Sequence, residues 1–119
     1  MNFERRGIAR MVEGFWVLEI TTPQFNSGGV AVFVGGKMFG GDSGFTWMGP
    51  YQEVGSLLKA RVAVHRFDRT VQSILGNVGD DFEMHFTGNL QGDVITGTAM
   101  ISGQPQQSLA LRLLRKANL

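Results

Sequence analysis

The sequence predicts an all-β fold, an eight-stranded antiparallel up-and-down barrel with at most one short helical turn near residues 70–76. Three observations predict it. Apolar and polar residues alternate with a period of two along most apolar runs, as in strands that bury one face. Glycine accounts for 17 of the 119 residues and is spread between these runs, which indicates many tight turns. Short turns join the runs, and this favours antiparallel neighbours over crossovers.

The expected strands follow one another along the chain at residues 11–21, 27–34, 37–42, 45–52, 57–67, 81–90, 94–102 and 108–115. Pro23 ends the first strand, because it has no N–H to donate to a ladder. Asp68 is expected to cap the single helical turn, and Gly76 to end it. A loop at residues 103–107 is expected to precede the last strand.

Alternation also assigns an inner face to each strand. The residues expected inside are Val12, Gly14, Trp16, Leu18 and Ile20 in the first strand, Val30, Val32 and Val34 in the second, Leu58, Ala60, Val62 and Val64 in the fifth, Phe82, Met84 and Phe86 in the sixth, and Leu109, Leu111 and Leu113 in the last. Eight strands close around an interior that side chains fill or that holds one small ligand.

Length and composition point to one domain. We expect residues 1–10 to be a short flexible lead-in and residues 11–116 to form a single barrel domain. The chain has no cysteine, which excludes disulfides and thiolate chemistry and fits a reducing compartment. The formal net charge is +1, so we expect neither nucleic-acid nor membrane binding. No signal-like apolar stretch opens the sequence, and we expect a cytoplasmic protein.

The residues that could carry chemistry do not form a recognisable reaction centre. Ser43 lies in Gly-Asp-Ser-Gly, whose spacing differs from a nucleophile elbow, and Asp42 is expected to brace the turn. His65 and His85 lie on polar strand faces, where solvated side chains are favoured over a metal site. The carboxylates near Asp80 are expected to form a solvated turn. We therefore expect no enzyme activity, no metal and no cofactor.

Two groups of apolar residues are candidates for binding. A cavity inside the barrel would be lined by Trp16, Leu18, Val32, Val62 and Phe86. The apolar residues outnumber the places in one small core, and those opposite the assigned inner faces are expected to form a surface for a homodimer or a protein partner: Phe15, Val17 and Phe33.

Four short motifs give the chain a family resemblance that covers about residues 11–115. They are Gly14-Phe15-Trp16, Gly40-Gly41-Asp42, Gly49-Pro50-Tyr51 and Val64-His65-Arg66-Phe67. In these motifs the chain resembles the GrlR family, small negative regulators of type III secretion, and the Gly-x-Trp at Gly14 is also similar to the opening of lipocalins. Gly40, Gly41, Asp42, Gly49 and Tyr51 mark the turn that is most specific to the family.

The resemblance implies a lipocalin-like barrel that dimerises and acts by binding a protein such as a transcriptional activator. It also implies an interior cavity for an apolar ligand. The partner loop would be Glu53, Val54, Gly55 and Ser56, which holds one acid where the characterised regulator carries Glu-Asp-Glu-Asp. The expected function is therefore non-enzymatic regulation through a protein partner, and the alternative is a carrier or sensor of a small apolar molecule.

Overall fold

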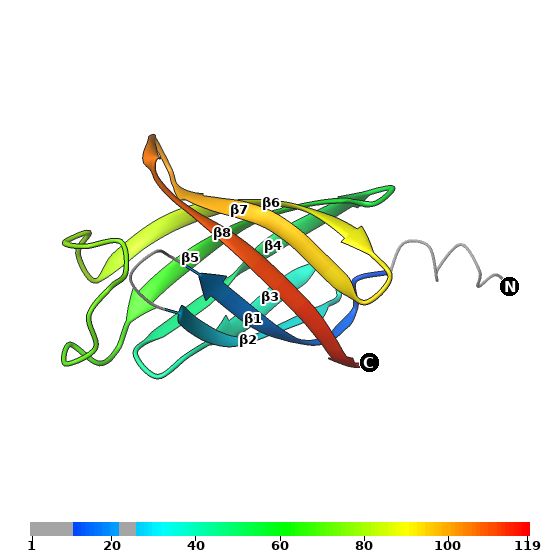
Figure 1. Cartoon of the computed structure of the whole chain (residues 1–119), viewed down its shortest axis with the longest axis horizontal. Coiled ribbons are helices and arrows are strands. Elements are labelled where there is room, and N and C mark those ends of the chain that lie inside the picture. Colours follow the sequence, from blue (N-terminus) through cyan, green and yellow to red (C-terminus); the bar gives the residue numbers. More distant parts are fainter. Residues whose placement is uncertain (1–10, 22–25) are drawn as a thin grey trace, which may run out of the picture.

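The computed structural model describes residues 11–21 and 26–119, and these form a closed antiparallel barrel (Figure 1). Its strands are β1 (Gly14–Thr21), β2 (Asn26–Val34), β3 (Lys37–Gly41), β4 (Phe45–Val54), β5 (Leu57–Arg66), β6 (Asp81–Gln91), β7 (Val94–Ile101) and β8 (Gln104–Ala117). Each strand pairs with its neighbours in sequence, and β1 closes the barrel by pairing with β8. The predicted fold is confirmed. The expected lead-in at residues 1–10 and the strand end at Pro23 lie outside the described residues.

The described residues contain no helix. The segment expected to form a helical turn is instead part of a long connection between β5 and β6, residues 67–80. Asp68 does not cap a helix: its Oδ1 accepts hydrogen bonds from the backbone N–H and the hydroxyl of Thr70, at 2.9 and 2.6 Å. Side-chain acceptors of this kind compete with helical hydrogen bonds and favour turns.

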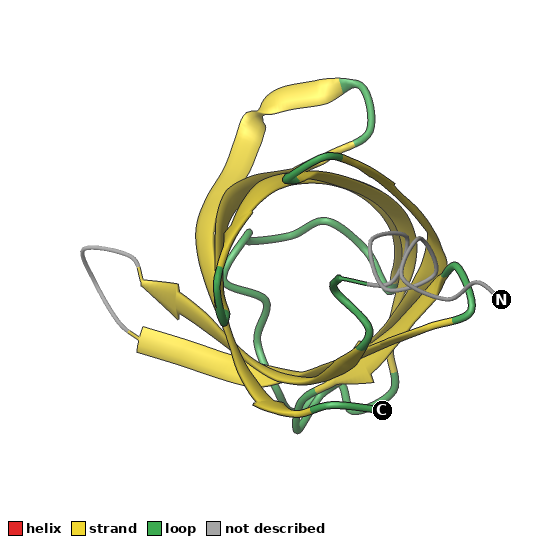
Figure 2. Ribbon diagram, turned by 90° about the vertical axis from the view of Figure 1, so that its right-hand side faces the viewer, coloured by secondary structure: helices red, strands yellow, loops and turns green. Residues whose placement is uncertain are grey.

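The two ends of the barrel differ (Figure 1). Two-residue turns at residues 35–36, 55–56 and 92–93 join the strands at one end, beside the C-terminus. The other end carries the turn at residues 42–44 and the connection 67–80. Seen along the barrel, loops lie across the circle of strands (Figure 2).

The start of β8 differs from the prediction. Residues 104–107 are strand rather than loop, and a two-residue turn at 102–103 joins β7 to β8. The pairing register shifts between Met100 and Ile101, so Pro105 lies opposite an irregular part of the ladder. Proline is tolerated at bulges because no ladder hydrogen bond depends on its missing N–H.

The inner face of β2 is the reverse of the predicted one. Ala31 and Phe33 are fully buried, whereas Val30 and Val34 are about 40% exposed (38% and 41%). In the observed register Trp16 of β1 lies opposite Ala31, so the small residue leaves interior space for the large ring. Both faces of β2 are apolar, and alternation alone therefore could not distinguish them.

One end of the barrel is filled by aromatic rings. Trp16, Phe33 and Tyr51 form two edge-to-face contacts, with ring centroids 6.2 and 5.2 Å apart. The Trp16 indole donates a 2.8 Å hydrogen bond to the carbonyl of Val12, and the Arg115 guanidinium lies 4.5 Å from the Trp16 ring centroid. These contacts hold the segment before β1 against the barrel and fill this end of its interior.

Candidate binding cavity

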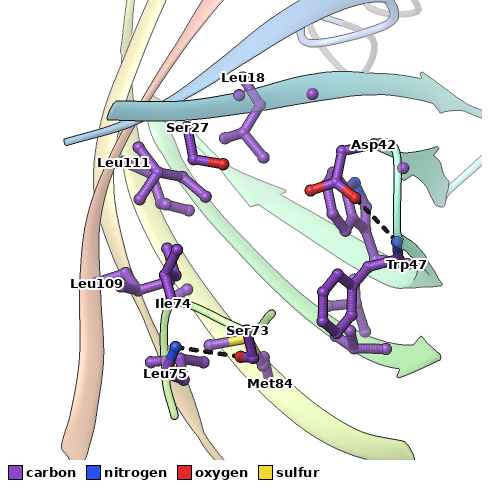
Figure 3. Close-up of a pocket in the computed structure, with 18 of the residues that line it drawn as sticks. Leu18, Ser27, Asp42, Trp47, Ser73, Ile74, Leu75, Met84, Leu109 and Leu111 are labelled. Carbon is purple, nitrogen blue, oxygen red and sulfur yellow. Dashed lines mark hydrogen bonds between the residues drawn. The ribbon is translucent and has the colours of Figure 1, made fainter. Parts of the chain in front are cut away.

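A cavity of about 460 Å³ occupies the part of the barrel beneath residues 71–75 (Figure 3). This volume falls in the range typical of sites for small organic ligands. The side chains that surround it are largely apolar and come from the barrel strands and from the connection 67–80, including Leu18, Ile20, Met38, Phe45, Trp47, Val62, Val64, Val71, Ile74, Leu75, Phe82, Met84, Phe86, Ala99, Leu109, Leu111 and Leu113.

Trp47 forms one wall of the cavity because two glycines face it. A Cβ atom on Gly40 would lie 2.3 Å from the indole Nε1, and one on Gly29 would lie 2.9 Å from Cη2. Both distances are shorter than atoms can approach without a shift of the backbone. The glycines therefore allow the indole to lie flat against β2 and β3, with its ring nitrogen buried and without a hydrogen-bond partner among the described residues.

Asp42 stands at the rim of the cavity and braces the turn before β4. Its Oδ1 accepts hydrogen bonds from the backbone N–H groups of Gly44 and Phe45, both at 2.9 Å. The backbone N–H of Asp42 also donates to the carbonyl of Phe45. The predicted role of Asp42 as a turn brace is confirmed, and in addition the residue lines the cavity.

The connection 67–80 covers the cavity and is anchored to the barrel rim. Val71 packs so closely on Gly44 that a Cβ there would lie 2.5 Å from it. Backbone N–H groups of Phe67 and Asp68 donate to the Gly44 carbonyl, and the Arg66 guanidinium donates to the carbonyl of Val71 at 2.7 Å. We call this connection the lid: its residues 71–75 line one side of the cavity, which stays partly open to solvent.

The structure places the predicted cavity residues in three different environments. Leu18, Val62 and Phe86 line the cavity. Trp16 belongs to the filled end of the barrel and does not reach the free space. Val32 was assigned to the wrong face: it is half-buried on the outside of β2, opposite Phe15.

Sequence reasoning did not identify the lid or the Trp47 wall as parts of the cavity. The lid residues show no alternation, so the pattern gave no inner face for them. The available signal for Trp47 was the presence of glycines inside two strands, at Gly29 and Gly40, because a glycine within a strand marks a place where a large ring can approach the backbone.

The predicted partner surface is also changed. Phe33 is fully buried, so its assignment to the surface is wrong, for the same reason of face reversal in β2. Phe15 and Val17 are half-buried and point away from the interior. Pairing places Phe15 in a row across four strands, an outer apolar row made of Phe15, Val32, Phe39 and Met48. Phe39 and Met48 are 42% and 50% exposed.

The predicted partner loop lies at the filled end. Val54 is 72% exposed and Gly55 and Ser56 form the turn, whereas Glu53 is directed back toward the barrel. Its Oε1 accepts a hydrogen bond from the Val12 N–H at 3.2 Å, and its Oε2 is buried without a partner among the described residues. Burial raises the pKa of the Glu53 carboxyl above its usual value, although the Val12 hydrogen bond opposes this shift.

Two groups of polar side chains with a histidine lie on the outer surface of the described strands. His65 Nδ1 lies 2.7 Å from Asp81 Oδ1 in an exposed pair. Ser102 Oγ lies 2.8 Å from His85 Nε2 and 2.7 Å from Glu83 Oε1. Glu83 also contacts the same histidine nitrogen as the serine does, whereas in a catalytic triad the acid holds the other nitrogen.

The Ser102 hydroxyl lowers the pKa of Glu83, with a smaller contribution from His85. No three histidine or acidic side chains in the described part of the chain are grouped as a metal site. In the same part, no helix is long and apolar enough to span a membrane.

No family model matches the chain, and no curated protein is detectably similar to it in sequence.

Proposed function

We propose that the protein binds a small apolar molecule inside the barrel and acts as its carrier or sensor. The observation that carries this proposal is the cavity of about 460 Å³, which is lined largely by apolar side chains. Close-packed protein interiors contain few voids larger than a water molecule. A space of this size is kept open at one end of a barrel whose other end is filled, and burial of an apolar ligand there is favourable by about 25 cal/mol per Å².

The covering lid supports the same proposal. Val71, Ile74 and Leu75 place apolar side chains against the core and toward the cavity, so a ligand would be surrounded by protein on the lid side as well. The lid contains no regular secondary structure, and loops of this kind are the elements that open most readily. Opening of the lid would widen the entrance for a ligand.

The proposal is tested with a neutral fluorescent probe, N-phenyl-1-naphthylamine, whose emission rises in apolar surroundings. We expect saturable binding to the wild type. Ala99→Phe fills part of the cavity, since Ala99 is a buried residue that lines it. The matched control is Ala63→Phe, because Ala63 is an exposed alanine on the outer face of β5.

Loss of binding in Ala99→Phe with retention in Ala63→Phe supports a site inside the barrel. Circular dichroism establishes that both variants are folded. Equal binding by the two folded variants, or no saturable binding by the wild type, contradicts the proposal.

A second candidate function is regulation through a protein partner, as the resemblance to the GrlR family suggests. The specific observation in its favour is the outer apolar row, in which Phe39 and Met48 are neighbours on adjacent strands and about half exposed. Contiguous exposed apolar side chains are typical of protein–protein contacts. On this proposal the row mediates a homodimer or docking of a regulator such as a transcriptional activator, in the cytoplasm.

Analytical ultracentrifugation tests the outer row. We expect a dimer that becomes monomeric in Met48→Lys, while Thr87→Lys on the exposed face of β6 remains dimeric. A wild-type monomer at high concentration that also retains no protein partner in a pull-down contradicts this second function without affecting the first.

A further inference from the structure

The polar lining of the cavity carries one sign of charge. Among the described lining residues, Asp42 is the only one with an ionisable side chain, and the other polar side chains are neutral: Ser27, Ser43, Gln72 and Ser73. Asp42 is therefore the one charged side chain that a bound molecule would meet among the described lining residues.

One carboxylate oxygen of Asp42 accepts hydrogen bonds within the turn, and the other does not. Oδ1 accepts the two backbone hydrogen bonds from Gly44 and Phe45. Oδ2 accepts none from the described residues, and Figure 3 shows the second oxygen directed away from the bonded one, into the space among the lining side chains. No basic side chain in the described part of the chain forms an ion pair with Asp42.

Arg66, a cation at this end of the barrel, has other partners. Arg66 donates to the carbonyls of Arg69 and Val71, and its guanidinium faces Asp80 at 3.9 Å. The Phe45 ring lies 5.9 Å from that guanidinium, and Phe45 rather than Arg66 lines the cavity. The carboxylate of Asp42 is thus without a counter-ion among the described residues, at the edge of an apolar space where it would attract a positive charge.

We propose that the ligand of the barrel is an apolar amine, whose ammonium group pairs with Asp42 while its hydrocarbon part fills the cavity. This inference rests on the proposed ligand-binding function and specifies the class of ligand. An alkylammonium is charged at neutral pH, as the lysine side chain with its pKa of about 10.4 is. It can donate hydrogen bonds to Oδ2 and to the neighbouring serine hydroxyls. A fatty acid would instead place a second negative charge beside Asp42, and like charges that lie next to each other repel.

Three probes of equal chain length separate the head group from the hydrocarbon: decylamine, decanol and decanoate, each measured by displacement of N-phenyl-1-naphthylamine at neutral pH. We expect the Kd of decylamine to be lower than that of decanoate by a factor of about ten or more, with decanol between them. A factor of ten in Kd corresponds to about 1.4 kcal/mol of binding free energy.

Asp42→Asn is the informative variant, because its side-chain oxygen can still accept the hydrogen bonds of the turn while the charge is removed. We expect this variant to lose most of the preference for decylamine and to bind decanol as the wild type does. Asp81→Asn is the control, because it removes the same charge from an exposed position on the outside of β6. It should retain the wild-type preference.

Each outcome bears on one of the two proposals. Decanoate or decanol binding as tightly as decylamine, or a preference for decylamine that persists in folded Asp42→Asn, overturns the amine proposal and leaves the ligand-binding function in place. Failure of all three probes and of the fluorescent probe to bind overturns the proposed function itself.

Discussion

Arg115 is expected to contribute more to stability than any surface ion pair of the barrel, and Arg115→Met tests this. Its Nη1 and Nη2 donate to the carbonyls of Glu13 and Met11 at 2.8 and 2.7 Å, and its Nε donates to Asp93 at 2.8 Å. The same guanidinium stacks on the Trp16 ring. One side chain therefore joins β8 to the segment that crosses the filled end.

The magnitude follows from these contacts. A net intramolecular hydrogen bond contributes about 1 kcal/mol, and a partly desolvated cation–π contact contributes about 1 kcal/mol more. The pair with Asp93 adds little, because that carboxylate is 75% exposed. Since methionine preserves part of the hydrocarbon packing, we expect Arg115→Met to lower the free energy of unfolding by about 2–3 kcal/mol.

The matched control is Arg112→Met on the same strand. Arg112 pairs with Glu19 at 2.9 Å, but both side chains are about half exposed (55% and 43%), so the loss should be below about 1 kcal/mol. Urea denaturation monitored by tryptophan fluorescence measures both variants. Equal losses in the two variants, or a loss below about 1 kcal/mol in Arg115→Met, would refute the claim that this residue anchors the filled end.

Two further predictions concern stability. Burial raises the pKa of Glu53 above 4.5, so the folded state binds a proton there more tightly than the unfolded chain does. The free energy of unfolding of the wild type therefore falls as the pH rises from below 4.5 through the pKa of the folded state. Glu53→Gln should therefore gain stability over the wild type toward neutral pH, and a difference in unfolding free energy that does not grow with pH contradicts this. Gly40→Ala places a methyl group 2.1 Å from the Val30 carbonyl oxygen and 2.3 Å from the Trp47 ring. We expect it to cost at least about 2 kcal/mol of unfolding free energy, and a stability equal to wild type in thermal unfolding contradicts that packing.

The strands could be predicted because most have one apolar and one polar face. In β5, Leu58, Ala60, Val62 and Val64 alternate with polar or small residues, and the structure buries all four. The inner face of β2 could not be predicted, since valines on one side compete with Phe33 and Ala31 on the other. Only the pairing with β1, where a tryptophan needs a small neighbour, decides between the faces.

Only part of the cavity lining could be predicted from the sequence. Its strand residues follow from alternation, as for Leu18 and Phe86. The lid could not be predicted, because residues 67–80 have no periodic pattern and their position depends on anchoring contacts with Gly44 and Arg66. The position of Asp42 on the cavity rim likewise depends on how the turn closes. Its short-range role in that turn was predictable from residue type alone.

The central claim is that the space inside the barrel is a binding site, and the most direct measurement is a crystal structure of the protein soaked or co-crystallised with decylamine. We predict density for the hydrocarbon chain between Phe86 and Trp47, beneath the lid, with the amine nitrogen within hydrogen-bond distance of Asp42. An interior that stays empty at saturating decylamine, or one in which side chains have collapsed to fill the space, would contradict the claim.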